Sequence, residues 1–168
     1  MISRNARLWE QSKIICPLAG PGVPSGISST AQWISLKMGE RACVIFNVKN
    51  GASAIVGASV NFAQATNVSG AGGKAISKGS YQWNSNCSAT DTLVNTTMTN
   101  NTFTFDATAN LYEQYCVDID AASDLDVSNA FCCFQPQVGN AANQTVDCTV
   151  IVFGLRQEQA TPPSMIIN

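Results

Sequence analysis

Apolar residues recur at every second position in this chain, and residues that favour turns interrupt each run after a few positions. In residues 54–64, for example, Val56, Val60 and Phe62 stand at even spacing with small or polar residues between them. A period of two is typical of a β-strand with one buried face. No window of eleven or more residues shows helical periodicity. The sequence therefore predicts an all-β fold, a jelly-roll-like β-sandwich.

The predicted strands follow one another at short intervals around one core. They are residues 13–16, 32–37, 42–49, 54–64, 75–82, 91–98, 102–105, 111–119, 130–137 and 145–156. Turn signals such as residues 49–51 (KNG) and 138–140 (VGN) separate them. A chain of 168 residues suits one compact domain.

Both ends of the chain are predicted to be interaction arms. We expect the β-sandwich domain to span residues 13–157, with an N-terminal arm of residues 1–12 and a C-terminal arm of residues 158–168. In the first arm, Arg4 and Arg7 stand beside the apolar pair Leu8 and Trp9. In the second, Pro162 and Pro163 favour an extended backbone before Met165, Ile166 and Ile167. These apolar residues need a docking site, either a groove on the same domain or a neighbouring subunit.

The composition argues against most enzyme classes. The sequence contains no histidine, and charged residues make up only 12% of it. The commonest general base, the usual nucleophile pairs and the common zinc or iron ligands are therefore missing. We expect no enzymatic activity and no metal or other cofactor.

Charge and hydropathy also argue against nucleic acid and membrane partners. The net charge of −2 leaves no electrostatic footprint for a nucleic acid. Apolar runs such as residues 150–153 are far shorter than the roughly 20 residues that span a bilayer. The short apolar stretch in residues 12–19 is interrupted by Pro17, and we interpret it as the first strand rather than a secretion signal.

The seven cysteines are predicted to be mostly free thiols. Their number is odd and no CxxC pair occurs, so neither a zinc ribbon nor a disulfide scaffold is indicated. Cys43, Cys116 and Cys148 stand within apolar strand patterns, where a free cysteine behaves as a small buried hydrophobe. Cys87 lies in a polar loop and is the cysteine that we expect to be most exposed.

A glycine-rich loop follows the strand at residues 54–64. Gly70, Gly72, Gly73 and Lys74 resemble a phosphate-binding loop, but the Walker pattern needs glycine at 68 and Ser or Thr at 75. The loop is too rich in Gly, Ala and Ser to pack against other residues. We expect a flexible hairpin or an exposed contact loop, where glycine allows a partner to approach the backbone closely.

Four aspartates stand close together at positions 118, 120, 124 and 126. Their spacing is not that of a calcium loop. Asp118 and Asp120 project from the same face of a strand, but no sugar platform accompanies them as in a glycosidase. We therefore expect a solvated turn, with Ser123 as the N-cap of a short helical turn. Among the tryptophans, Trp33 and Trp83 are assigned to the core and Trp9 to an interface.

Several segments of the sequence are similar to one protein family. They are residues 4–10 (RNARLWE), 64–75 (QATNVSGAGGKA), 118–122 (DIDAA), 124–127 (DLDV) and 159–164 (QATPPS), so the resemblance covers nearly the whole chain. The sequence resembles a family of small virion proteins of tailed bacteriophages. The resemblance implies a head decoration (cement) protein that binds the outer surface of major capsid subunits. It further implies a homotrimer on the capsid surface, made in the cytoplasm of the bacterial host.

Two other functions fit the same composition. A tail or baseplate structural protein would differ in having a few copies per virion instead of hundreds. A carbohydrate-binding module of the virion surface would need exposed aromatic side chains on one face, and Tyr81 and Trp83 stand two apart on a predicted strand. The candidate interaction residues are Arg4, Arg7, Leu8, Trp9, Gly70, Gly72, Gly73, Pro162, Pro163, Met165, Ile166 and Ile167.

Overall fold

The computed structural model describes residues 12–18 and 32–154, which form short and medium β-strands and one 3₁₀ turn. The strands are β1 (Ser12–Ile15), β2 (Ile34–Ser35), β3 (Arg41–Asn50), β4 (Ser59–Ala65), β5 (Lys74–Ala75), β6 (Ser80–Asn84), β7 (Val94–Thr97), β8 (Phe103–Thr104), β9 (Tyr112–Asp120), β10 (Cys133–Val138) and β11 (Gln144–Phe153). The 3₁₀ turn is η2 (Val127–Asn129). In these residues no helix is long and apolar enough to cross a membrane.

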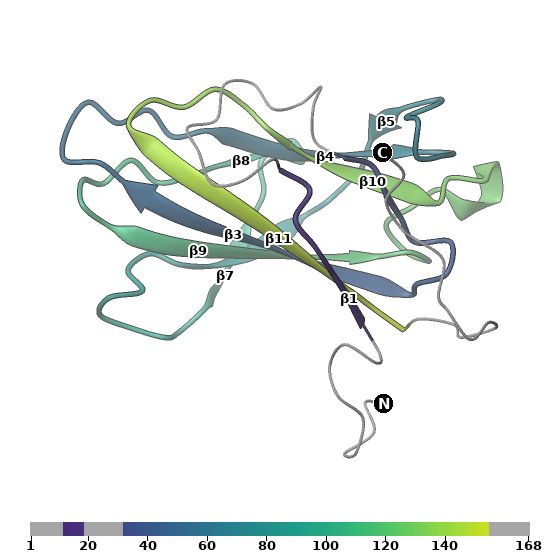
Figure 1. Cartoon of the computed structure of the whole chain (residues 1–168), viewed down its shortest axis with the longest axis horizontal. Coiled ribbons are helices and arrows are strands. Elements are labelled where there is room, and N and C mark those ends of the chain that lie inside the picture. Colours follow the sequence, from purple (N-terminus) through teal and green to yellow (C-terminus); the bar gives the residue numbers. More distant parts are fainter. Residues whose placement is uncertain (1–11, 19–31, 155–168) are drawn as a thin grey trace, which may run out of the picture.

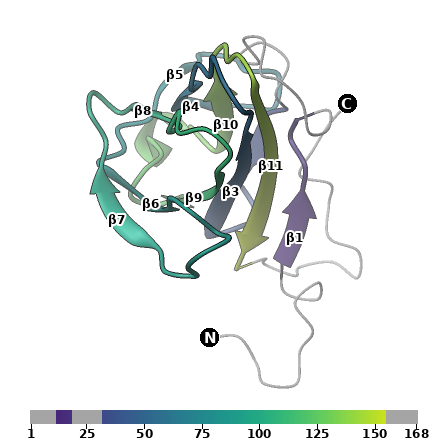
Figure 2. The same cartoon turned by 90° about the vertical axis from the view of Figure 1, so that its left-hand side faces the viewer.

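The strands form two antiparallel sheets that face each other as a sandwich (Figures 1 and 2). One sheet has the order β1-β11-β3-β9-β6-β7, and the other has the order β2-β10-β4-β5 with β8 paired to β4. The chain changes sheet at each step from β1 to β4 and again at each step from β9 to β11. Thus β11 lies between β1 and β3, while β10 lies between β2 and β4. This interleaving is that of a jelly roll, and it confirms the predicted fold class.

The inward residues of the alternating pattern fill the space between the sheets. In β3, for example, Ala42, Val44, Phe46 and Val48 are buried, whereas the residues between them point outward. The ring of Phe46 packs edge-on against that of Phe105, with 5.5 Å between the ring centroids. Each buried side chain of this size stabilises the fold by about 1.5–3 kcal/mol. The core gives the loops at both ends of the sandwich a rigid support.

The strand predicted at residues 54–64 begins later than expected. It starts at Ser59, and Val56 is 57% exposed and forms only an isolated bridge to Ala142. Close packing at Gly57 explains the difference, because a Cβ atom there would lie 2.0 Å from the carbonyl oxygen of Phe105. The even spacing of Val56 with the buried residues of β4 is therefore misleading.

The strand predicted at residues 75–82 is two short strands in different sheets, β5 and β6. Between them Ile76 is buried in the core, and its N–H donates to the carbonyl oxygen of Phe62 at 2.9 Å. The chain crosses from one sheet to the other at this point. The apolar residues shift from the even position of Ile76 to the odd positions of Tyr81 and Trp83, and the prediction of a single strand overlooked this break in the period of two.

The sandwich has two distinct ends in Figure 1. The beginning of β3, the ends of β9 and β11, and η2 lie at the right-hand end. The connections from β3 to β4 and from β10 to β11 lie at the left-hand end.

Candidate functional site

The glycine-rich loop, residues 66–73, joins the antiparallel strands β4 and β5 as a hairpin, as the sequence suggested, and hydrogen bonds within it fix its shape. The side-chain oxygen of Asn67 accepts hydrogen bonds from two backbone N–H groups within the loop, at 3.0 and 3.2 Å. The carbonyl oxygen of Ala71 accepts from the N–H and the hydroxyl of Thr66 at 3.0 and 3.1 Å. Gly70 and Gly72 have φ angles of 80° and 69°, which glycine adopts at little cost. The loop therefore has a defined shape.

Trp33 packs directly against this loop. A Cβ atom on Gly70 would lie 2.7 Å from the indole nitrogen of Trp33, and one on Gly73 would lie 3.8 Å from its ring. The expectation that the loop packs against nothing is therefore wrong. Trp33 itself is half-buried and lies outside the core, contrary to its predicted place. The indole covers the loop because only glycine leaves room for it there.

An apolar groove lies at the same end of the molecule as η2. It encloses about 560 Å³, a size typical of ligand clefts. Its walls come from the β2–β3 connection, from Thr66 at the end of β4, and from residues 121–132. Leu36 and Leu125 form its buried floor, whereas Val127 at its rim is 55% exposed. Three segments that are distant in sequence thus share one apolar surface.

Phe131 joins the groove to the glycine-rich loop. It lines the groove, and a Cβ atom on Gly72 would lie 3.8 Å from its ring. The ammonium nitrogen of Lys74 lies 4.3 Å from the centroid of the same ring, a cation–π contact. The structure therefore brings the predicted Gly70, Gly72 and Gly73 next to the groove. We call the loop and the groove together the groove surface.

The aspartates predicted to form a solvated turn shape one wall of the groove. Asp120 accepts hydrogen bonds from the backbone N–H groups of Ala122 and Ser123 at 2.8 and 3.1 Å, and these bonds lower its pKa. Asp124 accepts from the N–H of Asp120 at 2.8 Å and from Lys78 at 2.7 Å. The turn is thus fixed by its own carboxylates.

Asp126, rather than Ser123, precedes the short helical turn. η2 starts at the next residue, so Asp126 occupies the N-cap position and the predicted N-cap is wrong. The side chain of Asp126 makes no capping hydrogen bond. The carboxylate of Asp126 instead pairs with Lys74 and accepts from Asn129 and Ser128, and these contacts hold its pKa well below the usual range. In residues 12–18 and 32–154 no three His, Cys, Asp or Glu side chains are grouped so that they could hold a metal ion.

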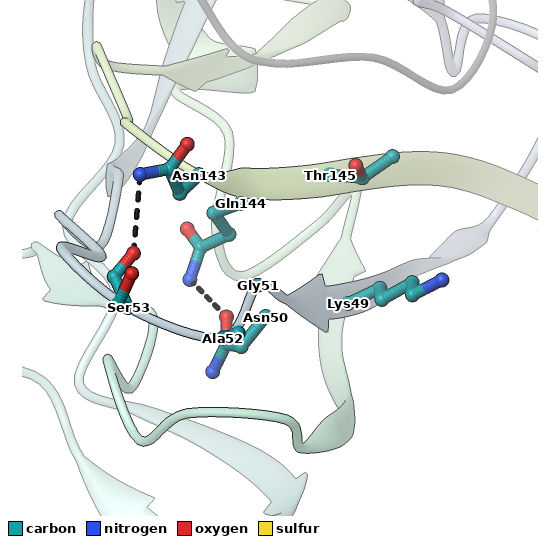
Figure 3. Close-up of a pocket in the computed structure, with 8 residues that line it drawn as sticks. All are labelled: Lys49, Asn50, Gly51, Ala52, Ser53, Asn143, Gln144 and Thr145. Carbon is teal, nitrogen blue, oxygen red and sulfur yellow. Dashed lines mark hydrogen bonds between the residues drawn. The ribbon is translucent and has the colours of Figure 1, made fainter.

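The left-hand end of the sandwich carries a polar cleft instead (Figure 3). It encloses about 420 Å³ between the β3–β4 connection and the start of β11. The side-chain amide of Asn143 donates to the carbonyl oxygens of Ser53 and Ala54 at 3.1 and 3.2 Å. Deeper in, the amide of Gln144 donates to the side-chain oxygen of Asn50 at 2.8 Å. These polar groups already have partners within the protein, so the cleft is a structural feature of the fold.

A buried carboxylate lies behind this cleft. Glu113 is 2% exposed, and it accepts hydrogen bonds from the Asn50 amide at 3.0 Å and the Tyr115 hydroxyl at 2.7 Å. Burial raises the pKa of Glu113 to about 7, against the opposing effect of these two hydrogen bonds. The network joins β3, β9 and β11. None of its buried side-chain atoms lacks a hydrogen-bond partner in the described residues, so we assign it to folding and not to chemistry.

All seven cysteines lie in the described part of the chain and are free, which confirms the prediction. Cys148 is buried and burial raises its pKa. Cys43 and Cys116, which the sequence placed in the core, are only partly buried on the outer face of the six-stranded sheet. Cys87 is exposed as expected, and Cys16 is exposed as well.

Tyr81 and Trp83 share one side of β6, and this side faces the core. Tyr81 stacks on Phe103 with 4.3 Å between ring centroids, and Trp83 stacks on Tyr115 with 5.5 Å between them. Both are partly buried against the core. Trp83 therefore packs against the core, close to where it was predicted. The two rings do not form a sugar platform on the outer face of their sheet.

The remaining predicted interaction residues lie outside the described residues. They are Arg4, Arg7, Leu8, Trp9, Pro162, Pro163, Met165, Ile166 and Ile167. The sequence alone did not point to the groove-lining residues Leu36, Ala122, Val127 and Phe131. The last three stand close to the aspartate-rich turn in the sequence, whereas Leu36 carries no such signal.

Comparison with known proteins identifies no family for this chain. No family model matches the sequence, and no curated protein matches it. Among solved structures, the crystal structure of SPBc2 prophage-derived protein YomS is similar, with 11% sequence identity and a TM-score of 0.45 over 85% of this chain and 93% of that one. A similarity this distant assigns neither a family nor a function.

Proposed function

We propose that this protein is a structural virion protein that decorates and cements a bacteriophage capsid. The proposal begins from the sequence resemblance to small virion proteins of tailed phages. In it, the protein forms a homo-oligomer, a trimer, on the outer surface of major capsid subunits. It is made in the host cytoplasm and acts by adhesion, without catalysis, cofactor, nucleic acid or membrane.

The groove surface is the observation that best supports this proposal. It combines an ordered loop with an apolar groove whose rim residues Ala122 and Val127 are exposed. Apolar side chains of this kind bind other proteins when they are held in a fixed arrangement. Because each contact would be repeated over a symmetric shell, a modest affinity at one site becomes a large avidity.

Binding to phage heads tests the proposal directly. Heads that lack this protein are mixed with the purified chain, and bound copies are counted by quantitative mass spectrometry and located by cryo-electron microscopy. We expect hundreds of copies on the outer surface of the head. A few copies at the tail would support a tail or baseplate protein instead, and absence from purified virions would contradict both.

A matched pair of variants locates the contact. Val127→Asp places a charge at the rim of the groove, whereas Val56→Asp makes the same change at a site of similar exposure elsewhere, 57% against 55%. We expect Val127→Asp to reduce binding to heads at least tenfold and Val56→Asp to leave it unchanged. Equal binding by both variants would show that the groove surface takes no part in binding to heads.

A further inference from the structure

The end of β11 lies at the rim of the apolar groove. The carbonyl oxygen of Phe153 accepts a hydrogen bond from the N–H of Glu40 at 3.0 Å. Gly39, which lines the groove, is so close to β11 that a Cβ atom there would lie 2.7 Å from the Val152 side chain. The chain therefore passes from the described residues into residues 155–168 directly beside the groove.

The sequence beyond β11 contains an apolar segment that matches the groove in chemistry. Met165, Ile166 and Ile167 are consecutive aliphatic or thioether side chains. The groove offers aliphatic and aromatic walls from Leu36, Leu125 and Phe131. Burial of such side chains is favourable in proportion to the apolar area removed from water.

The residues between β11 and the apolar segment favour a chain that leads away from the groove over one that turns back. Residues 155–161 (LRQEQAT) contain no Gly, Pro, Asn, Asp or Ser, which are the residues that reverse a chain. Pro162 and Pro163 then favour extended backbone. Eleven residues lead from Gly154 to Met165, and an extended chain of this length reaches about 35 Å. A segment built in this way reaches a neighbouring molecule more readily than the groove beside its own exit.

We propose that the apolar groove of one copy binds the segment Met165–Ile167 of a second copy. This inference rests on the proposed function and names the contact that links copies of the protein to one another. The weaker head binding expected of Val127→Asp then follows from the loss of avidity when the copies separate. Repeated around a ring, each copy gives its segment to one neighbour and receives a segment from the other, a heterologous contact that closes the ring.

The oligomeric state of full-length variants tests this inference. Val127→Asp changes the groove, the double variant Ile166→Asp with Ile167→Asp changes the segment, and Val56→Asp is the control. Sedimentation equilibrium over a range of concentrations gives the association constant of each. We expect both the groove variant and the segment variant to associate at least tenfold more weakly than the wild type, and the control to associate normally. Wild-type association by either variant would overturn the proposal.

A mixing experiment separates exchange between copies from docking within one copy. The groove variant keeps an intact segment, and the segment variant keeps an intact groove. An equimolar mixture of the two should therefore form mixed complexes more strongly than either variant forms complexes alone. If the segment binds its own groove, both variants instead melt at a lower temperature without a change in mass, and the proposal is wrong. Binding of the wild-type protein to heads is measured separately. If the wild type binds heads while both variants associate normally, this inference fails and the decoration proposal stands.

Discussion

Glu113 shows that an inward position of a strand can hold a carboxylate when the surrounding strands supply donors. It lies on the same side of β9 as the buried Tyr115 and Val117. Burial also raises the pKa of Tyr115, so its hydroxyl stays protonated and donates to the carboxylate. Because the folded protein raises the pKa of Glu113 to about 7, the charged form is less compatible with the fold than the neutral form.

We predict that the protein loses stability as the pH rises from about 4.5 to 7. In this range the folded state binds more protons at Glu113 than the unfolded state, so the free energy of unfolding falls with pH, by up to about 3 kcal/mol. Below this range the opposite dependence sets in, because the pKa values of Asp120 and Asp126 are lowered in the fold. Urea denaturation at a series of pH values measures both trends.

The variant Glu113→Gln tests whether Glu113 causes this slope of the free energy of unfolding against pH. Without a titrating group at 113, the free energy of unfolding should be nearly constant between pH 5 and pH 7. Glu40→Gln is the control, since Glu40 is an exposed glutamate and its replacement should leave the slope intact. A slope that persists in Glu113→Gln would show that another group causes it.

Gly70 provides a second test at the scale of one residue. The φ of Gly70 is 80°, which strains any residue with a side chain. A Cβ atom there would also lie 2.7 Å from the indole nitrogen of Trp33. We predict that Gly70→Ala destabilises the protein by about 1–3 kcal/mol. Gly79→Ala is the matched control, because no atom lies within 4 Å of a Cβ atom there, and it should change stability by no more than about 0.5 kcal/mol. Chemical denaturation of both variants gives the comparison, and equal stability would contradict the packing of Trp33 on the loop.

Among the strands, the long central ones could be predicted closely, whereas the division between β5 and β6 could not. β3 and β9 differ from their predicted ranges by one residue at each end, because long pairing with two neighbours keeps the alternation regular. β5 and β6 were merged in the prediction although the apolar residues change from even to odd positions between Ile76 and Tyr81, because a spacing pattern alone does not say which sheet a strand joins. Val56 was misplaced for a related reason, as the backbone contact at Gly57 depends on a residue far along the chain.

The exposure of the thiols predicts their order of reaction. Cys16 and Cys87 are exposed, whereas Cys133 and Cys148 are buried, and Cys148 lies in the core. We predict that a thiol reagent modifies Cys16 and Cys87 first in the native protein, and all seven cysteines once the protein is denatured without reductant. Mass spectrometry after timed labelling identifies the order. Fewer than five reactive thiols in the denatured protein would indicate disulfides and contradict the free state.

At the scale of the whole molecule, the jelly roll assembles a site that no single stretch of sequence encodes. The glycine-rich loop could be recognised from residues 66–73 alone, because its composition is local. The groove could not, since its walls come from the β2–β3 connection, the end of β4 and residues 121–132. These segments become neighbours only because β10 pairs with both β2 and β4.

The pairing of the first strand with the last has a consequence for how the chain can be cut. Ser12 pairs with Phe153 at one end of the β1–β11 ladder, and Cα atoms of paired residues in antiparallel strands lie about 5 Å apart. The sandwich is therefore nearly a closed loop of chain. A circular permutant that joins residue 154 to residue 12 by a short Gly-Ser linker and opens within the exposed residues 88–92 should fold cooperatively, as measured by denaturation. Its success would mean that the order of strands in space, and not their order of synthesis, determines this architecture.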